Sequence, residues 1–420
     1  MQQSEQPSPP ARRRRAYVSI LGTTQMHLRS PVIVALWSAI FPGLGHLLLS
    51  KYVSGVILFL WEVVINLKAH LNLSIFYTFT GNFEYAKAVL DKRWLLLYIP
   101  TYLFAIWDSY RSTVDMNNHF VLAAREDAEV QPFIAHPLSF NYVDKSSPWV
   151  AVFWSAITPG AGQLIIHRIF VAYFLLILWI IVVYMSNALP AIYHTALGQF
   201  DLAKNLANKQ WMLNIPSILF FAIYDAYTNT VESNKLFEWE QSKYLKKEYQ
   251  DRRFPMPFEA GQERARMYVV SNFEHSIKLE SAVTELQIRG IPKQDILAVP
   301  LDKQDEDKLL FDRTHSSDGH STLDFPIISA ALFALFGIIY GFLFRWGPVL
   351  WALIGTGAGF ALGLGIKLII SRKRRETLRA ELPEVVLVVA CDDRQLDQVK
   401  DALWKNGALG VGRLCLDDDA

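Results

Sequence analysis

The chain has 420 residues, of which 52% are hydrophobic and 19% are charged, and its formal net charge is +1. The charged fraction lies below the roughly 25% of a typical soluble domain, and the near-neutral charge offers no positive field for nucleic acid. Apolar stretches such as 148–166 and 325–344 approach the roughly 20 residues that cross a bilayer. The composition predicts a polytopic, mainly helical protein of the cell membrane. Its main interaction partner is therefore expected to be the lipid bilayer.

Residues 1–29 form a basic tail with four consecutive arginines, Arg12 to Arg15. Only a short apolar stretch follows before Thr23, which does not fit a signal peptide. Positive charge next to a membrane segment favours the cytoplasmic side. We therefore expect a cytoplasmic N-terminus.

Residues 30–117 (repeat 1) and 147–234 (repeat 2) are two copies of one sequence unit, separated by a linker at 118–146. SPVIVALWSAIFPGLG at 30–45 matches SPWVAVFWSAITPGAG at 147–162, and FAIWDSYRSTVDMN at 104–117 matches FAIYDAYTNTVESN at 221–234. The offset is 117 residues in both matches. An internal duplication follows, and two copies are expected to pack as a pseudo-symmetric pair.

Each repeat contains three apolar segments, at 31–50, 52–67 and 94–110 and again at 148–167, 169–189 and 211–227. A proline and two glycines interrupt the first segment near its middle. They are Pro42, Gly43 and Gly45 in repeat 1 and Pro159, Gly160 and Gly162 in repeat 2. Proline removes a backbone donor and glycine loosens a helix. We expect a short helix, a break, and a second helix that runs into the second segment.

This broken segment leaves two topologies open. If it re-enters and returns to the same side, each repeat crosses the membrane twice and the chain crosses six times; if it spans, each repeat crosses three times and the chain eight times. Only re-entry places Lys51, Arg111 and Arg168 all in the cytoplasm, as the positive-inside tendency favours.

Asp108 and Asp225 end the third apolar segment at the same position of each repeat. Carboxylates at membrane depth are costly, and a helix C-terminus disfavours negative charge. We expect ion pairs within each repeat, Asp108 with Lys51 and Asp225 with Arg168. The alternatives are carboxylates solvated at the membrane interface, or a proton relay.

His46 occupies in repeat 1 the position of Gln163 in repeat 2. A metal ligand or general base would not usually tolerate that exchange, whereas a hydrogen bond to the broken backbone suits both side chains. His315 and His320 lie in a polar linker, which is weak evidence for a metal site. We predict no cofactor.

The P-G-x-G-[HQ] break, followed by Lys51 or Arg168 six residues after the last glycine, resembles small bacterial multi-pass proteins related to the two-transmembrane-helix domain family. The likeness covers about 20 residues per repeat. It implies a topology rather than an activity.

The C-terminal third follows a polar helix or linker at 235–265, which we expect to be solvated. Strands are predicted at 267–273, 295–301, 384–392 and 411–416, and helices at 275–290 and 393–406. The first helix should bury Ile277, Leu279, Ala282, Val283 and Leu286. The two cysteines, Cys391 and Cys415, are expected to be free thiols.

The predicted strands and helices form two βαβ halves, at 266–302 and 372–420, around a polar linker at 303–324 and a glycine-rich membrane hairpin at 325–371. A hairpin returns the chain to one side of the membrane, so the halves can complete one ferredoxin-like α+β domain in the cytoplasm. The hairpin glycines give the small-xxx-small spacing that lets helices approach closely: Gly355, Gly357, Gly359, Gly363 and Gly365.

A βα half, a glycine-rich apolar hairpin and a second βα half with Asn406-Gly407-Ala408 near its end resemble bacterial general-stress and low-temperature-induced membrane proteins of unknown function. The likeness covers roughly residues 266–416. It implies a stress-related setting without naming a ligand.

Three function classes follow. We favour a non-enzymatic membrane scaffold or sensor whose cytoplasmic module binds a small ligand or a protein, and a homo-oligomer is compatible with this function. The second class is a transporter or channel, because duplicated broken helices build substrate sites in many transporters. The sequence shows no catalytic set typical of the third class, an enzyme.

Overall fold

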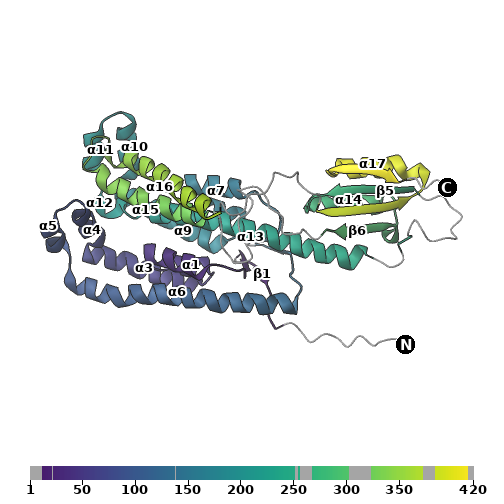
Figure 1. Ribbon diagram of the computed structural model, residues 1–420, viewed down its shortest axis with the longest axis horizontal. Coiled ribbons are helices and arrows are strands. Elements are labelled where there is room, and N and C mark those ends of the chain that lie inside the picture. Colours follow the sequence, from purple (N-terminus) through teal and green to yellow (C-terminus); the bar gives the residue numbers. More distant parts are fainter. Residues whose placement is uncertain are drawn as a thin grey trace. The chain divides into compact units, whose positions relative to one another are not determined.

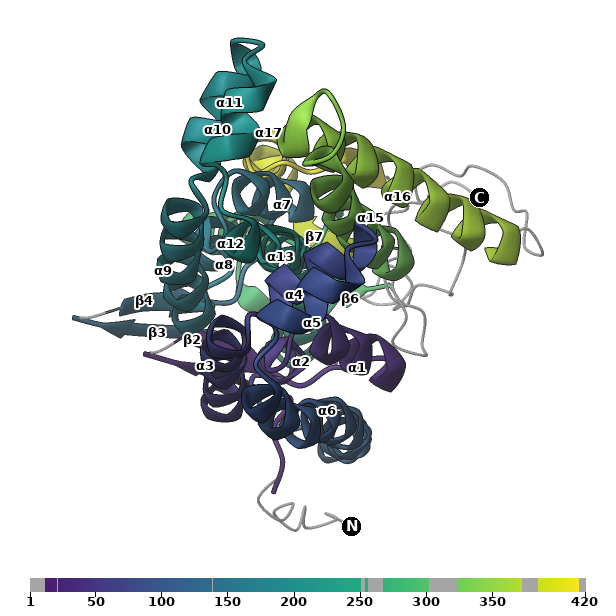
Figure 2. The ribbon, with the colours of Figure 1, turned by 90° about the vertical axis from the view of Figure 1, so that its left-hand side faces the viewer.

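The computed structural model describes residues 12–20, 22–137, 139–250, 254–255, 267–301, 323–371 and 384–414. The chain divides into two compact units: unit 1 comprises 1–142, 146–232 and 309–375, and unit 2 comprises 143–145, 233–308 and 376–420. Long helices of unit 1 run side by side in Figure 1, and Figure 2 views them from one end. Unit 2 contains the larger of the described sheets.

The first half of unit 1 begins with a two-stranded antiparallel hairpin and continues as helices. Its elements are β1 (Ala16–Ser19), β2 (Gly22–Gln25), α1 (Pro31–Ile40), α2 (Leu44–Leu48), α3 (Tyr52–Ala69), α4 (Leu71–Phe79), α5 (Phe83–Val89) and α6 (Lys92–Glu126).

The second half repeats this order at the same offset of 117 residues, from β1 through α5. Its elements are β3 (Phe133–His136), β4 (Ser139–Tyr142), α7 (Pro148–Ile157), α8 (Ala161–Ile165), α9 (Ile169–Ser186), α10 (Ala188–Ala196), α11 (Phe200–Leu206), α12 (Lys209–Met212) and α13 (Ile215–Tyr249). Both hairpins lie in segments that we had predicted to be tail and linker.

Two helix boundaries differ from prediction. The second helix of the broken segment does not run into the next one, because Ser50 and His167 have left-handed backbones, with φ of 57° and 54°, and end α2 and α8. The third segment of repeat 2 is divided between α12 and α13 just before Pro216, whereas α6 continues through Pro100. Pro216 lies in the first turn of α13, where its missing N–H needs no partner.

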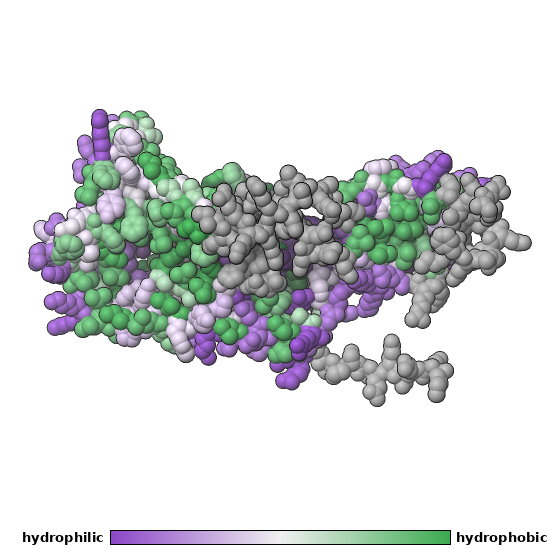
Figure 3. All heavy atoms as spheres, viewed as in Figure 1, coloured by the Kyte–Doolittle hydropathy of each residue, from purple (hydrophilic) through white to green (hydrophobic). Residues whose placement is uncertain are grey.

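Four helices in the described part of the chain are long and apolar enough to cross a membrane: α3, α9, α15 (Asp324–Gly341) and the 347–366 part of α16 (Gly347–Ser371). Hydrophobic residues cover much of the visible surface over these helices, and hydrophilic residues gather at the end that carries α4, α5, α10 and α11 (Figure 3). In the hairpin, an added Cβ at Gly355 or Gly359 would collide with the α15 backbone.

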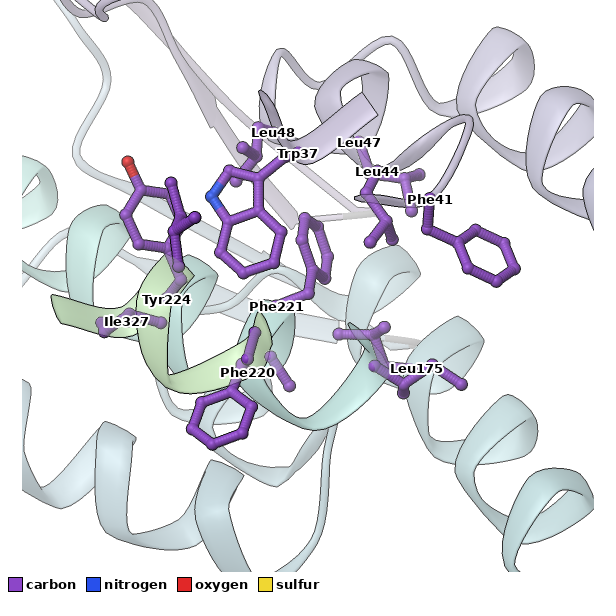
Figure 4. Packing of buried hydrophobic residues seen from close by; sticks show 14 of the residues in the cluster. Trp37, Phe41, Leu44, Leu47, Leu48, Leu175, Phe220, Phe221, Tyr224 and Ile327 are labelled. Atoms are coloured by element: carbon purple, nitrogen blue, oxygen red, sulfur yellow. The ribbon is translucent and has the colours of Figure 1, made fainter. Parts of the chain in front are cut away.

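The core of unit 1 joins residues of both repeats and α15. Figure 4 shows the fully buried Trp37 of α1 beside Phe221 and Tyr224 of α13, with ring centroids 5.6 and 5.2 Å away. Ile327 of α15 belongs to the same cluster. Full burial of one such large side chain contributes about 1.5–3 kcal/mol. Packing therefore joins the two repeats.

Unit 2 contains a four-stranded antiparallel sheet in the order β6-β7-β5-β8. Its elements are β5 (Met267–Phe273), α14 (Ile277–Ile288), β6 (Ile296–Pro300), β7 (Val385–Cys391), α17 (Leu396–Lys405) and β8 (Gly410–Leu414). The predicted strands and helices are present with shifts of a few residues at their ends.

Two details of unit 2 correct the sequence analysis. Ile277 is 55% exposed, because it opens α14 before the helix packs on the sheet, whereas the four other predicted core residues of this helix are buried. The polar helix after residue 235 is not fully solvated: Leu245 and Tyr249 of α13 join the core of the sheet. Residues 256–266 and the predicted 415–416 end of the last strand lie outside the described part of the chain.

Candidate functional site

The breaks at Pro42 and Pro159 are shaped by tight contacts at the glycines that follow. Gly43 has φ of 96°, and a Cβ there would collide with the carbonyl oxygen of Gly55 in α3. Gly160 has φ of 104° and is equally close to the Ala172 carbonyl in α9. Only glycine tolerates both the left-handed backbone and the approach. Each break is therefore held against the next long helix.

The second glycine of each break contacts the preceding helix. A Cβ at Gly45 would collide with Ser38 and the Val34 carbonyl of α1, and one at Gly162 with Ser155 and the Ala151 carbonyl of α7. The short helices α2 and α8 consequently fold back onto α1 and α7.

Contacts along α6 show the course of the broken segment. The Arg29 amide donates to Asn117 Oδ1 at 3.0 Å, and Tyr102 Oη donates to the carbonyl oxygen of Ala39 at 2.7 Å. Asn117 and Tyr102 are 15 residues apart in one helix, or about 22 Å at 1.5 Å per residue. Lys51 Nζ then donates to Ser112 Oγ at 2.5 Å. Measured along α6, the chain runs from the level of Asn117 to the level of Tyr102 in α1 and returns to the level of Ser112 after α2.

The repeat 1 carboxylate, Asp108, is 12% exposed and has three basic neighbours. His46 Nε2 lies 3.0 Å from Oδ2, Arg111 Nη2 donates to Oδ1 at 3.0 Å, and Lys51 Nζ is 3.9 Å from Oδ2. The expected partner Lys51 is thus the most distant, and 41% of its side chain is exposed. Arg111, three residues along α6, is a partner that the sequence analysis missed.

The repeat 2 carboxylate, Asp225, is fully buried and pairs with Arg168, as the sequence predicts. Gln163 Nε2 donates to its Oδ2 at 3.2 Å, and Asn229 Nδ2 donates to Oδ1 at 2.9 Å. Arg168 Nη2 also donates to the Leu47 carbonyl oxygen at 3.1 Å. Burial excludes the solvated alternative for Asp225 within this fold. The ion pair links repeat 2 to α2 of repeat 1.

His46 and Gln163 turn toward α6 and α13 rather than toward the broken backbone that we had predicted as their partner. His46 bonds Asp108, whereas Gln163 bonds Asp225 and donates to the Ala222 carbonyl oxygen at 2.8 Å. Both side chains link a short helix to the neighbouring long helix. The exchange of histidine for glutamine preserves this link.

The sequence analysis overlooked Glu62, which is 4% exposed in the middle of α3. A network of amides leads from it to repeat 2. Asn66 Nδ2 lies 3.4 Å from Glu62 Oε1, and Gln210 Nε2 donates to Asn66 Oδ1 at 2.7 Å. Asn72 Nδ2 donates to Asn214 Oδ1 at 3.1 Å. The sequence signal was one acid in a mainly apolar helix, with Asn66 four residues further along.

A hollow of about 530 Å³ lies beside this network. It is lined by Leu67, His70, Leu73, Lys204, Asn205, Ala207, Asn208, Lys209, Gln210 and Trp211. Repeat 1 and repeat 2 both contribute to its wall.

Among the described residues, no group of three or more His, Cys, Asp or Glu is placed to hold a metal ion. His315 and His320 lie outside the described residues.

In unit 2, Glu285 and Cys391 are among the groups with shifted pKa values. Hydrogen bonds from Asn406, Arg289 and Lys405 lower the pKa of Glu285 to about 2. Burial, together with the charges of two following aspartates, raises the pKa of Cys391 to about 11. Glu285 connects α14 to Lys405 of α17 and to Asn406 after it. Cys391 is the last residue of β7.

No protein family model, no curated protein and no solved structure matches this chain. The functional argument therefore depends on the fold and the contacts described above.

Proposed function

We propose that the protein is a non-enzymatic integral membrane scaffold or sensor whose unit 2 is a cytoplasmic ferredoxin-like module that binds a small ligand or a protein. The observation that carries this proposal is the strand order β6-β7-β5-β8. Strand β7, which follows the α15–α16 hairpin in the chain, lies between β6 and β5, which precede it.

This interleaving has a consequence for the membrane. Neither βαβ half can form the sheet alone, so both ends of the hairpin must be on one side of the bilayer. The order of β5-α14-β6 and β7-α17-β8 in one antiparallel sheet supports the ferredoxin-like assignment. Domains of this shape often bind regulatory ligands, which is an analogy from fold alone.

We infer six membrane crossings: α3, the first part of α6, α9, the first part of α13, α15 and α16. An 18-residue helix such as α3 spans about 27 Å at 1.5 Å per residue, whereas α1 and α7, with 10 residues each, span about 15 Å. The contacts of Ala39 with Tyr102 and of Lys51 with Ser112 support re-entry of the α1–α2 segment.

Re-entry gives both repeats the same orientation. Lys51 and Arg168 then lie with Arg111 and the N-terminal arginines on one side, which the positive-inside tendency assigns to the cytoplasm. The matched element bounds from β1 to α5 and from β3 to α11 support a duplication as the origin of this arrangement.

The long helix α13 connects the units along the chain. Residues 215–232 belong to unit 1 and 233–249 to unit 2, and Asp225 lies in the former. A ligand that changes the packing of Leu245 or Tyr249 on the sheet would act on the helix that holds the buried ion pair. This continuity is the route that we propose for sensing. The resemblance to general-stress proteins suggests that the signal is stress-related.

A transporter is the second candidate, favoured by the buried Asp225–Arg168 pair beside a broken helix. Flux through vesicles containing the purified full chain separates the two candidates. A scaffold should leave the leak of protons, sodium, potassium and chloride equal to that of empty vesicles. A flux that Asp108→Asn and Asp225→Asn abolish, and that the exposed control Glu84→Gln retains, would contradict the scaffold.

A further inference from the structure

Glu62 is a carboxyl group in the interior of a helix that is long and apolar enough to cross a membrane. It is 4% exposed. No ion pair of Glu62 with a basic side chain is present in the described part of the chain. A buried carboxylate without a cation is costly, and taking up a proton removes that cost.

The surroundings of Glu62 offer hydrogen bonds but no compensating charge. Asn66 and Tyr98 hydrogen-bond to the carboxyl group, and Oε2 has no partner among the described residues. Tyr98 and Tyr102 are the titratable side chains that face it from α6, and α4 and α12 contribute the amides of Asn72 and Gln210 to the same network. Amide donors do not make this a cation site, but they accommodate a neutral carboxylic acid.

Repeat 2 lacks the same feature, although α9 has the same bounds as α3 at the repeat offset. The residues that correspond to Glu62, Asn66 and Tyr98 at the repeat offset are Trp179, Val183 and Ile215. The fold of the repeat therefore does not require a carboxyl group here. Glu62 is an addition specific to repeat 1.

The hollow lies beside the amide network that contacts Glu62. Gln210 lines the hollow and donates to both the carbonyl oxygen and Oδ1 of Asn66, at 2.9 and 2.7 Å. Glu62 is thus two side chains away from the surface. The same amides hold α3 and α4 of repeat 1 against α12 of repeat 2.

We propose that Glu62 is a hydrogen-ion binding site at the contact between the two repeats. A proton delivered by water from the hollow converts the carboxylate to a carboxylic acid, and no other bond forms or breaks. Loss of the proton leaves a buried negative charge beside the amide network between the repeats, with no ion pair in the described part of the chain to compensate it. The site binds a proton whether or not the protein carries solutes across the membrane.

Infrared difference spectroscopy of the full chain in lipid nanodiscs tests this proposal. At neutral pH the wild-type protein should show a protonated-carboxyl band that shifts in D₂O and also shifts when glutamate is labelled with ¹³C. The band should disappear in Glu62→Gln and persist in Glu84→Gln, whose carboxylate is 89% exposed.

A wild-type spectrum without the band would overturn the proposal, as would a band of equal intensity in Glu62→Gln. The ¹³C label assigns the band to glutamate, so a wild-type protein without a glutamate band refutes the proposal even if the Glu62 variant does not fold. A band that the glutamate label leaves in place belongs to an aspartate and also refutes the proposal.

Discussion

Removing the charge of Asp225 should destabilise the protein far more than removing that of Asp108, although the two residues occupy the same position of the repeat. Asp225 is fully buried with Arg168, which is 4% exposed, whereas Lys51 beside Asp108 is 41% exposed. Breaking a buried pair leaves an uncompensated charge and costs about 3–5 kcal/mol. Exposed pairs contribute about 0–1 kcal/mol.

We therefore expect Asp225→Asn to lower the free energy of unfolding by about 3–5 kcal/mol. Asp108→Asn should lower it by about 1–2 kcal/mol, because a hydrogen bond to His46 is also weakened. Asparagine keeps the size of the side chain, so the difference reports the charge. The two variants are matched controls within one chain.

The assay is reversible unfolding in mixed detergent micelles, followed by tryptophan fluorescence. Replacing both partners, Arg168→Met with Asp225→Leu, should recover part of the loss, because neither member of the pair is then left as an unpaired buried charge. Equal losses for the two asparagine variants, or a larger loss for Asp108→Asn, would refute the reasoning.

Three further predictions concern other parts of the chain. Gly43→Ala should destabilise the protein more than Gly81→Ala in thermal unfolding, because both have a positive φ but only Gly43 meets the backbone of α3; equal shifts would contradict this. The depressed pKa of Glu285 means that its stabilisation is present above pH 4.5 and is lost as the pH falls toward about 2. Pepsin cleavage of unit 2 should therefore increase over this range, and less steeply in Glu285→Gln, whereas identical profiles would count against the contact. In a Cys415→Ser variant, the remaining thiol of Cys391 should react slowly with iodoacetamide at pH 8, because burial raises its pKa to about 11. The reaction should become rapid after unfolding, and a fast reaction of the folded protein would contradict the burial of this thiol.

The features that the sequence predicted were those with strong local causes. Pro42 and Gly43 marked the helix break because proline lacks a donor and glycine permits the left-handed backbone. The buried Arg168–Asp225 pair followed from the cost of an isolated charge at membrane depth. Strands β5, β6 and β7 of unit 2 followed from short runs rich in valine and other apolar residues.

The features that it missed depend on contacts between distant segments. The strands of the hairpins β1–β2 and β3–β4 have four residues each, which is too short to show a clear period. Ile277 has the right spacing for a buried residue but precedes the point where α14 meets the sheet. Glu62 reaches Asn66 within α3, but only the fold brings it to Tyr98 of α6 and connects Asn66 to Gln210 of repeat 2.

The most direct test of the account is the orientation of the two repeats. Glu84 of α5 and Asp201 of α11 are equivalent positions, with side chains 89% and 97% exposed, and Asp115 of α6 is 58% exposed. Single cysteines at these positions, in a chain with Cys391 and Cys415 replaced by serine, are treated in intact cells with a membrane-impermeant maleimide. The account predicts labelling at 84 and 201 and protection at 115 until lysis. Labelling of only one of the two equivalent positions would mean inverted repeats and would contradict it.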